Sequence, residues 1–174
     1  QIRNKYGIKR DFLLYVGVFD QHKNIHGLLK AFSSLRFNDL DLVLAGANSD
    51  TRYFSFIRRL IEELEIEKKV HILGYIPQSD MAGLYNAAKI VISLSFYEGF
   101  GLPILEAMAC GRPVIASGNT SMREIVDSSG ILVDPYNIEQ VTHTIENLLS
   151  DDALRNHLSQ KALIVRGGNI LLVR

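Results

Sequence analysis

Two glutamates flank a short glycine-containing turn in the stretch SFYEGFGLPILEAMACGRPVIAS, which covers residues 95–117. Glu98 precedes the turn, and Glu106 follows it eight positions later. Two carboxylates act as general acid and base only when both flank one reacting bond. Glycine carries no side chain, so a turn built from it lets a ligand approach the backbone closely. The stretch therefore predicts a site where both carboxylates and backbone contact a ligand.

The turn ends where a helix is expected to begin. Gly99 and Gly101 precede an apolar run over residues 102–110, and Pro103 suits the first helical position. Free backbone N–H groups of residues 100–104 would lie at the positive end of the helix dipole, which favours a phosphate. A tight turn without any ligand explains the two glycines equally well when they are considered alone.

A second phosphate contact is predicted in GVFDQHKN, residues 17–24. An apolar run ends at Gly17, and Lys23 and Asn24 open the next helical pattern. A lysine at a helix N-terminus opposes the dipole, but it gains when an anion is attracted to the same place. A solvated surface lysine is the ordinary alternative. The combination of Gly17 with Lys23 favours the phosphate contact.

A third loop, HILGYIP, places Tyr75 and Ile76 directly after Gly74. These two side chains would sandwich a planar base. An aromatic residue in such a loop is as often ordinary packing, so this prediction is the weakest of the three.

The elements that must position these residues are six short apolar runs. They cover residues 12–18, 41–47, 70–76, 89–95, 113–117 and 130–134. Unbroken apolar runs of this length are typical of buried parallel strands. Apolar residues at helical spacing lie between them, over residues 25–35, 54–64, 81–85 and 138–149. The pattern predicts a Rossmann-like three-layer α/β/α sandwich with a mainly parallel six-stranded sheet.

Ligands of such folds bind outside the carboxyl ends of the strands. That rule selects the loops at 17–24, 46–50, 74–79, 95–102 and 117–121. All the candidate residues lie in these loops or directly after them. Ser79 or Asp80 is expected to cap the helix that follows the third strand.

The composition narrows the function classes. With 19 basic and 19 acidic residues the net charge is zero, which argues against nucleic acid or an anionic membrane as the main partner. The single cysteine, Cys110, cannot form an internal disulfide, so it is expected to be a buried packing residue in a reducing cytoplasm. No apolar run reaches the roughly 18 residues of a membrane span, and no signal peptide opens the chain.

Other sites are disfavoured. Asp39 and Asp41 form an Asp-x-Asp pattern, but it lies at the amino end of a strand, away from the ligand edge. His22 and His26 lack a third metal ligand. No G-x-G-x-x-G follows the first strand, which argues against a nicotinamide enzyme.

Four segments resemble the carboxyl-terminal domain of the family 4 retaining glycosyltransferases, which have the two-domain GT-B fold. They are YVGVFDQHKNIHGLLKAF (15–32), VHILGYIPQSDMAGLYNAA (70–88), SFYEGFGLPILEAMACGRPVIAS (95–117) and GILVDPYN (130–137). Glu98 and Glu106 match the family's pattern of two glutamates separated by seven residues. The resemblance runs from residue 1 to about residue 160, in the family's order and spacing.

The resemblance implies a role for each candidate. Lys23 would contact the diphosphate of a nucleotide sugar, Glu98 the transferred sugar, and Glu106 the ribose. The other implied donor-binding residues are Gly17, Val18, His22, Asn24, Tyr75, Ile76, Gly99, Phe100, Gly101 and Leu102. Val18 stands where many members carry an arginine that shares the diphosphate with the lysine. His22 is adjacent to Lys23, and whether it replaces that arginine is left open.

The implied activity is transfer of a hexose, with mannose as a candidate, from a UDP- or GDP-sugar to a glycan or lipid-linked acceptor, with retained configuration. Lys23 and Glu98 would act in catalysis, and no cofactor or metal is expected. The alternatives are a non-catalytic nucleotide-binding module and half of a GT-B nucleotide-sugar epimerase.

The resemblance also bears on domain organisation. Residues 1–163 are expected to form the donor-binding domain, and the amino-terminal acceptor domain of the GT-B fold is expected to be missing, so the chain alone should be inactive. Residues 164–174 depart from the family and are expected to be an atypical tail that vector-derived sequence or a shifted reading frame would explain. The full-length protein is expected in the cytoplasm, at the inner face of a membrane if its acceptor is lipid-linked.

Overall fold

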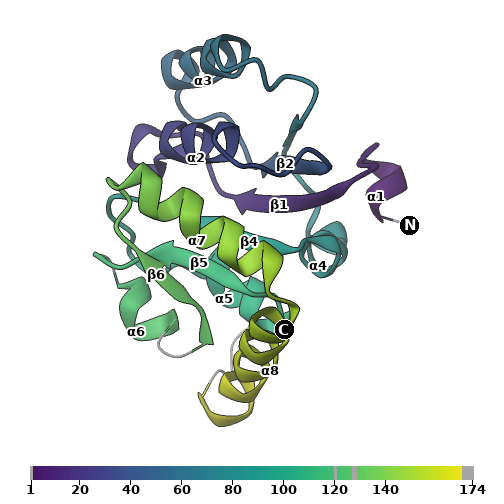
Figure 1. The fold of residues 1–174 in the computed structure, drawn as a ribbon, viewed down its shortest axis with the longest axis vertical. Coiled ribbons are helices and arrows are strands. Elements are labelled where there is room, and N and C mark those ends of the chain that lie inside the picture. The colour runs from purple at the N-terminus through teal and green to yellow at the C-terminus, as the bar shows by residue number, and fades with distance from the viewer. Residues whose placement is uncertain (1, 120, 127–128, 170–174) are drawn as a thin grey trace.

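The computed structural model describes residues 2–119, 121–126 and 129–169 of the chain. Its centre is a sheet of six parallel strands in the order β3-β2-β1-β4-β5-β6 (Figure 1). The strands are β1 (Asp11–Val16), β2 (Leu40–Ala45), β3 (Val70–Gly74), β4 (Ile90–Ser93), β5 (Val114–Ser117) and β6 (Ile131–Val133). The predicted Rossmann-like sheet is confirmed, and each predicted apolar run overlaps one strand.

The central strands are apolar because both of their faces are buried. Residues 12–15 of β1 are all at most 1% exposed, and every residue of β2 is buried. Side chains alternate between the two faces of a strand. Leu13 and Tyr15 therefore join one hydrophobic layer, while Phe12 and Leu14 join the other. This two-sided burial is why the strands show no alternation of apolar and polar residues.

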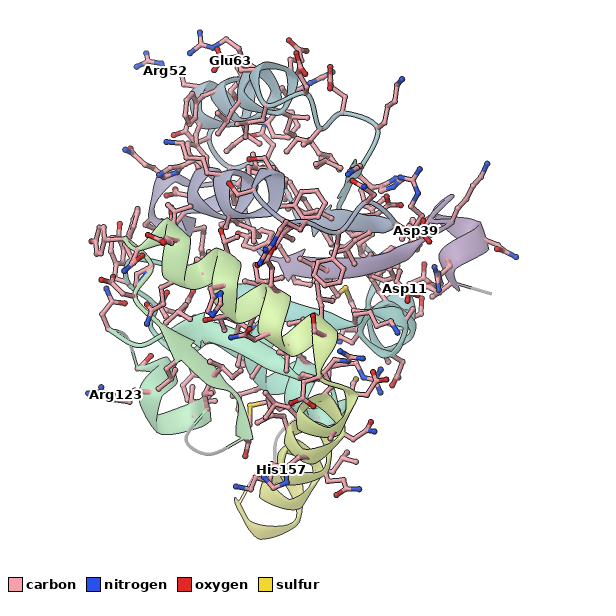
Figure 2. The ribbon with its side chains drawn as sticks, viewed as in Figure 1. Asp11, Asp39, Arg52, Glu63, Arg123 and His157 are labelled. Atoms are coloured by element: carbon pink, nitrogen blue, oxygen red, sulfur yellow. The ribbon has the colours of Figure 1, made fainter. Side chains whose placement is uncertain are left out.

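Helices cover both faces of the sheet. Over one face lie α2 (Ile25–Ser33), α3 (Thr51–Glu63) and α7 (Ile138–Ser150). Over the other lie α4 (Gln78–Ala87), α5 (Leu102–Ala109) and α6 (Met122–Val126). In α3 the apolar side chains Ile57, Leu60 and Ile61 are buried, whereas Arg52 and Glu63 point outward from the fold (Figure 2). The amphipathic pattern thus selects the face that packs on the sheet.

Three helices have no counterpart among the predicted ones: α1 (Ile2–Lys5), α6 and α8 (Asp152–Asn169). α1 packs against α4, and α8 packs against α5 and α7. Gly111, with φ 64°, ends the turn after α5 as predicted, and the Leu163 side chain packs against it. Long-range packing of this kind is invisible to local periodicity.

The prediction for the N-cap of α4 is wrong. α4 begins at Gln78 after Pro77, with no side chain capping it, so neither Ser79 nor Asp80 is its cap. Asp80 lies in the first turn of α4, where hydrogen bonds from Lys5 and then Tyr6 lower the pKa of its carboxyl group and hold α1 in place.

Cys110 packs against the hydrophobic core as predicted, but it is partly exposed at the end of α5 rather than buried. The predicted domain boundary at residue 163 falls within α8 and stays a prediction. Residues 170–174 of the expected atypical tail lie outside the described residues. Among the residues described, no helix combines the length and apolar character needed to cross a membrane.

The loops after β1 and β2 lie in close contact beyond the strand ends. The N–H of Gly17 donates to the carbonyl of Ala45 at 2.9 Å, and the N–H of Phe19 donates to Ala47 at 2.9 Å. A Cβ atom on Gly46 would lie 1.8 Å from the carbonyl oxygen of Gly17. Only glycine fits at position 46, because any side chain would separate the two loops.

The strand order defines a topological switch point between β1 and β4. From β1 the chain passes to β2 on one side, whereas β4 lies on the other side of β1. The loops that follow β1 and β4 therefore diverge at the carboxyl edge of the sheet. Ligands of doubly wound folds bind in the crevice at such a point.

Candidate functional site

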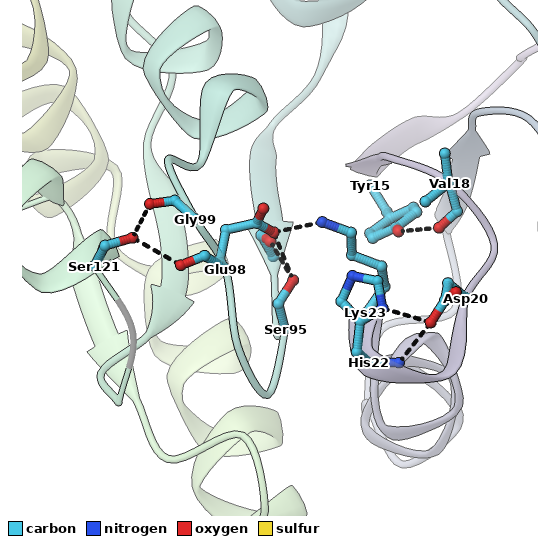
Figure 3. Close-up of polar contacts among 10 residues, drawn as sticks. Tyr15, Val18, Asp20, His22, Lys23, Ser95, Glu98, Gly99 and Ser121 are labelled. Atoms are coloured by element: carbon cyan, nitrogen blue, oxygen red, sulfur yellow. Dashed lines mark hydrogen bonds and ion pairs between the residues drawn. The ribbon is translucent and has the colours of Figure 1, made fainter.

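Lys23 and Glu98 meet at this switch point (Figure 3). Nζ of Lys23 lies 2.6 Å from Oε2 of Glu98, and the two side chains are only 16% and 17% exposed. Water and salt screen a shielded ion pair less than one on the open surface. The sequence places both residues at the carboxyl edge, but it does not predict that they touch.

A short 3₁₀ turn, η1 (Gln21–Lys23), presents the lysine. Asp20 caps this turn by accepting the N–H of His22 at 3.1 Å. Asn24 follows in the left-handed conformation, with φ 54° and ψ 38°, and links η1 to α2. The chain therefore reverses sharply around Lys23, which is what aims its side chain away from α2.

Asn24 is held by its own side chain and is 1% exposed. Its Oδ1 accepts the N–H of Gly27 at 3.2 Å, and its Nδ2 donates to the carbonyl of Pro135 at 2.9 Å. These two bonds hold the buried side chain within the fold, which suits a positioning role for Asn24 beside Lys23. The donor contact predicted for Asn24 stays a prediction.

The side chain of His22 contacts two other side chains. Its Nδ1 bonds to the carboxylate of Asp20, and its ring stacks on Tyr97 with centroids 4.8 Å apart. Hydrogen bonds from the backbone and side chain of His22 lower the pKa of the Asp20 carboxyl group. The carbonyl of His22 accepts the N–H of Phe96 at 2.8 Å, which joins the loops after β1 and β4.

Val18 is 38% exposed and offers the site only an apolar side chain. Its carbonyl accepts a hydrogen bond from the buried hydroxyl of Tyr15 at 2.9 Å. Burial raises the pKa of Tyr15, so the hydroxyl stays protonated and keeps donating. A Cβ on Gly17 would lie 2.7 Å from that same hydroxyl, which explains the glycine there without a ligand.

Two serines fix Glu98. Ser95 is fully buried, and its Oγ donates to Oε2 of Glu98 at 3.1 Å. The hydroxyl of Ser121 contacts the main-chain carbonyls of Glu98 and Gly99, at 3.0 and 2.9 Å. Both ends of Glu98, its carboxylate and its carbonyl, are therefore held before any ligand binds.

The turn after Glu98 differs from the prediction that the backbone N–H groups of residues 100–104 are free to bind an anion. Pro103 has no N–H and is the second helical residue, and the N–H of Ile104 donates to the carbonyl of Gly101. Within the described part of the chain, the N–H groups of residues 99–102 have no hydrogen-bond acceptor. The candidate anion-binding backbone is thus 99–102 rather than 100–104.

The two glycines of this turn differ. Gly101 has φ 66° and forms the N-cap of α5, so its left-handed backbone favours glycine. Gly99 has no positive φ, and a Cβ built on it would meet nothing. The fold alone therefore explains Gly101 but not Gly99.

Glu106 lies on α5, one turn from its start, and is partly buried. The hydroxyl of Tyr85, on α4, donates to its Oε2 at 2.8 Å. Burial, with a further contribution from Glu106, raises the pKa of Tyr85. This bond holds one carboxylate oxygen of Glu106 and leaves the other for a different donor.

Tyr75 and Ile76 present different surfaces. Tyr75 is 78% exposed, whereas Ile76 is 7% exposed and belongs to the hydrophobic layer beneath α4. Tyr75 and Ile76 were predicted to sandwich a planar base. Only Tyr75 exposes its side chain, so the pair offers one surface for a base rather than two. Phe100 and Leu102 are about half exposed at the same sheet edge.

Sequence reasoning misses four residues that shape this site: Ser95, Ser121, Tyr85 and Tyr97. Ser121 lies in the loop 117–121 that the strand rule selects, so its place is predictable, but its partner is not. Ser95 and Tyr97 adjoin Glu98 in the chain. A hydroxyl in a ligand-edge loop is the signal that would have pointed to the two serines.

The residues described include no group of three or more His, Cys, Asp or Glu side chains that could hold a metal ion. Asp41, the disfavoured metal candidate, is 2% exposed, and its carboxylate contacts Arg10 and His71 instead. Both contacts lie at the amino end of β2, on the opposite edge from Lys23.

The family model described as "Glycosyl transferases group 1" matches residues 1–164. The O-antigen chain mannosyltransferase B of Escherichia coli is 37% identical over 155 residues, which are 87% of this chain and 40% of that protein. The chain thus spans about two fifths of that relative's length.

Two solved structures have the same fold. Sucrose-phosphate synthase from Thermosynechococcus elongatus superimposes with a TM-score of 0.81 at 30% identity, over 94% of this chain and 42% of the other. Anabaena HepE, crystallised with UDP and glucose, superimposes with a TM-score of 0.88 at 24% identity, over 94% and 46% of the two chains.

Proposed function

The chain belongs to the glycosyl transferases group 1 family, as the carboxyl-terminal domain of a GT-B fold, and we propose that it binds the sugar donor of a retaining glycosyltransferase. The donor is a nucleoside-diphosphate sugar. The observation that carries this proposal is the ammonium group of Lys23, placed 2.6 Å from Glu98 at the switch point of the sheet. A cation, a carboxylate and backbone N–H groups that have no acceptor among the described residues lie at this edge of the sheet.

The diphosphate would take the place between Lys23 and the backbone of residues 99–102. A lysine and a helix N-terminus stabilise the negative charge that gathers on a leaving diphosphate. Once the diphosphate has displaced Glu98 from Lys23, both groups are in place, so little further reorganisation is needed during the reaction. We propose that they serve in place of a metal ion.

Glu98 and Glu106 would contact different parts of the donor. Glu98 lies beside the anion-binding backbone, which suits hydroxyl groups of the transferred sugar. Glu106 lies one turn further along α5, which suits the ribose. Tyr75 would cover one face of the base. Carboxylates accept hydrogen bonds from sugar hydroxyls without needing to change protonation state, so this proposal gives neither glutamate an acid–base role.

The sugar–phosphate bond would break through an oxocarbenium-like state. The departing phosphate oxygen would accept the proton of the acceptor hydroxyl, so the glycosidic bond forms on the same face as the leaving group. No nucleophile from this domain is required. At the end of the cycle Glu98 keeps its negative charge and Lys23 keeps its positive charge.

We propose a hexose as the transferred sugar. Mannose is favoured because the O-antigen chain mannosyltransferase shares 37% identity with this chain. The acceptor would be a glycan or a lipid-linked glycan. Its binding site would lie on a further domain, since the matched relative is more than twice as long as the part that this chain covers.

Calorimetric titration of the 174-residue chain with UDP, GDP and ADP tests the donor proposal. At least one nucleotide is expected to bind, because Lys23 and the backbone site lie within this domain. No binding at millimolar concentration to any of the three would contradict it. Sugar transfer by this chain alone is not expected, and measured transfer would refute the need for a second domain.

A further inference from the structure

Ser121 contacts two successive carbonyl groups of the candidate phosphate turn. Its Oγ lies 3.0 Å from the carbonyl oxygen of Glu98 and 2.9 Å from that of Gly99. The serine comes from the loop between β5 and α6, more than twenty residues away in the chain. One hydroxyl shared by two carbonyls forms a three-centre bond, a recognised arrangement in proteins.

This contact fixes the direction of two N–H groups. In a trans peptide the N–H points opposite to the C=O of the same peptide plane. The structure has no cis peptide bonds among the residues described. Because the carbonyls of Glu98 and Gly99 both face Ser121, the N–H groups of Gly99 and Phe100 both point away from it.

The other side of the turn is where the charged groups lie. Figure 3 shows Glu98 and Gly99 between Ser121 and Lys23. The N–H groups of Gly99 and Phe100 find no acceptor among the described residues. Successive N–H groups that point the same way form an anion-binding concavity. A phosphate there would meet two backbone donors and be within the field of the Lys23 ammonium.

We propose that Ser121 is a positioning residue for diphosphate binding, because its hydroxyl locks the two peptide planes whose N–H groups receive a phosphate. The inference rests on the proposed function. Ser121 does not itself touch the donor. Without the hydroxyl, both planes are free to rotate, and the ligand must then order them, which weakens binding.

The test uses pyrophosphate, UDP and uridine as probes, with the wild-type chain and Ser121→Ala. Ser121→Ala is expected to weaken pyrophosphate and UDP binding by the same factor, about 2- to 10-fold, the range that one net hydrogen bond supports. Any binding of uridine, which has no phosphate, should stay unchanged. A purely structural role would instead change the thermal unfolding midpoint and weaken all probes alike.

Ser55→Ala is the matched control. Ser55 also donates its hydroxyl to a backbone carbonyl, that of Thr51 at 2.9 Å, but it lies on the exposed surface of α3. This variant should bind all three probes like the wild type. Equal pyrophosphate binding by wild type and a folded Ser121→Ala would overturn the inference while leaving the proposed function intact.

A second measurement needs no variant. In ¹⁵N-resolved NMR spectra of the wild-type chain, pyrophosphate should shift the amide signals of Gly99 and Phe100 more than that of Ser55. If pyrophosphate binds without shifting these two amides, the inference is wrong. If the wild type binds neither pyrophosphate nor any nucleotide, the proposed function fails, and this inference fails with it.

Discussion

Nζ of Lys23 lies 2.6 Å from Oε2 of Glu98, although 75 residues separate them in the chain. The contact gives the lysine a counter-charge while no ligand is bound. An incoming diphosphate must compete with Glu98 for the ammonium group. Once it succeeds, Oε2 of Glu98 loses its strongest partner and becomes free to accept a hydroxyl of the sugar. Phosphate binding and sugar recognition would thus be coupled through one ion pair.

Removal of the negative charge at Glu98 should strengthen phosphate binding. Glu98→Gln is expected to bind pyrophosphate about two- to fivefold more tightly, since partly exposed ion pairs are worth up to about 1 kcal/mol. The measurement is calorimetric titration. Glu63→Gln is the control, because Glu63 pairs with Arg59 on the exposed surface of α3. Weaker pyrophosphate binding by Glu98→Gln would show that the ion pair positions Lys23 rather than competing for it.

Glu106 should matter only for ligands that contain ribose. Glu106→Gln is expected to weaken UDP binding several-fold, because the amide oxygen still accepts a hydrogen bond but a neutral one contributes about 1 kcal/mol less than a charged one. Pyrophosphate binding should not change. Glu139→Gln, on the exposed surface of α7, controls for the change of net charge. Unchanged UDP affinity in Glu106→Gln would remove the ribose role.

The two glycines of the turn should respond differently to alanine. Gly101→Ala is expected to destabilise the fold by about 1 kcal/mol, because residue 101 has φ 66° and its Cβ would lie 3.3 Å from Met122. Gly99→Ala should leave the unfolding midpoint nearly unchanged, since its Cβ meets nothing. It should still weaken UDP binding, because the methyl group would occupy space that the phosphate needs.

Urea unfolding and UDP titration of both variants separate these effects. If Gly99→Ala binds UDP like the wild type, the phosphate does not approach the backbone at residue 99. The anion site would then have to lie nearer the start of α5.

The sheet was predictable because the central strands β1, β2, β4 and β5 are buried on both faces, which gives unbroken apolar runs in the sequence. Helices with one buried face, such as α3, were predictable because their apolar residues recur at helical spacing. α8 was not, since its place depends on contacts with α5 that arise only after folding. The local sequence of a helix does not show which surface of another element the helix will contact after folding.

The candidate site, too, was predictable from the sequence only in part. The strand rule places Lys23 and Glu98 at one edge, because both follow parallel strands. It does not predict that Asn24 is buried and bonded to Pro135, or that Ser121 reaches the carbonyls of Glu98 and Gly99. Those contacts join segments far apart in the chain, and their distances follow from the packing of whole loops.

The central claim is that Lys23 binds the diphosphate of the donor. Titration of the wild type and Lys23→Ala with UDP tests it most directly, with Lys30→Ala on the exposed surface of α2 as the control. Lys23→Ala is expected to bind UDP roughly 10- to 100-fold more weakly, as loss of a charge-assisted hydrogen bond predicts, while Lys30→Ala binds like the wild type. Equal affinity of Lys23→Ala and the wild type for UDP would contradict the account.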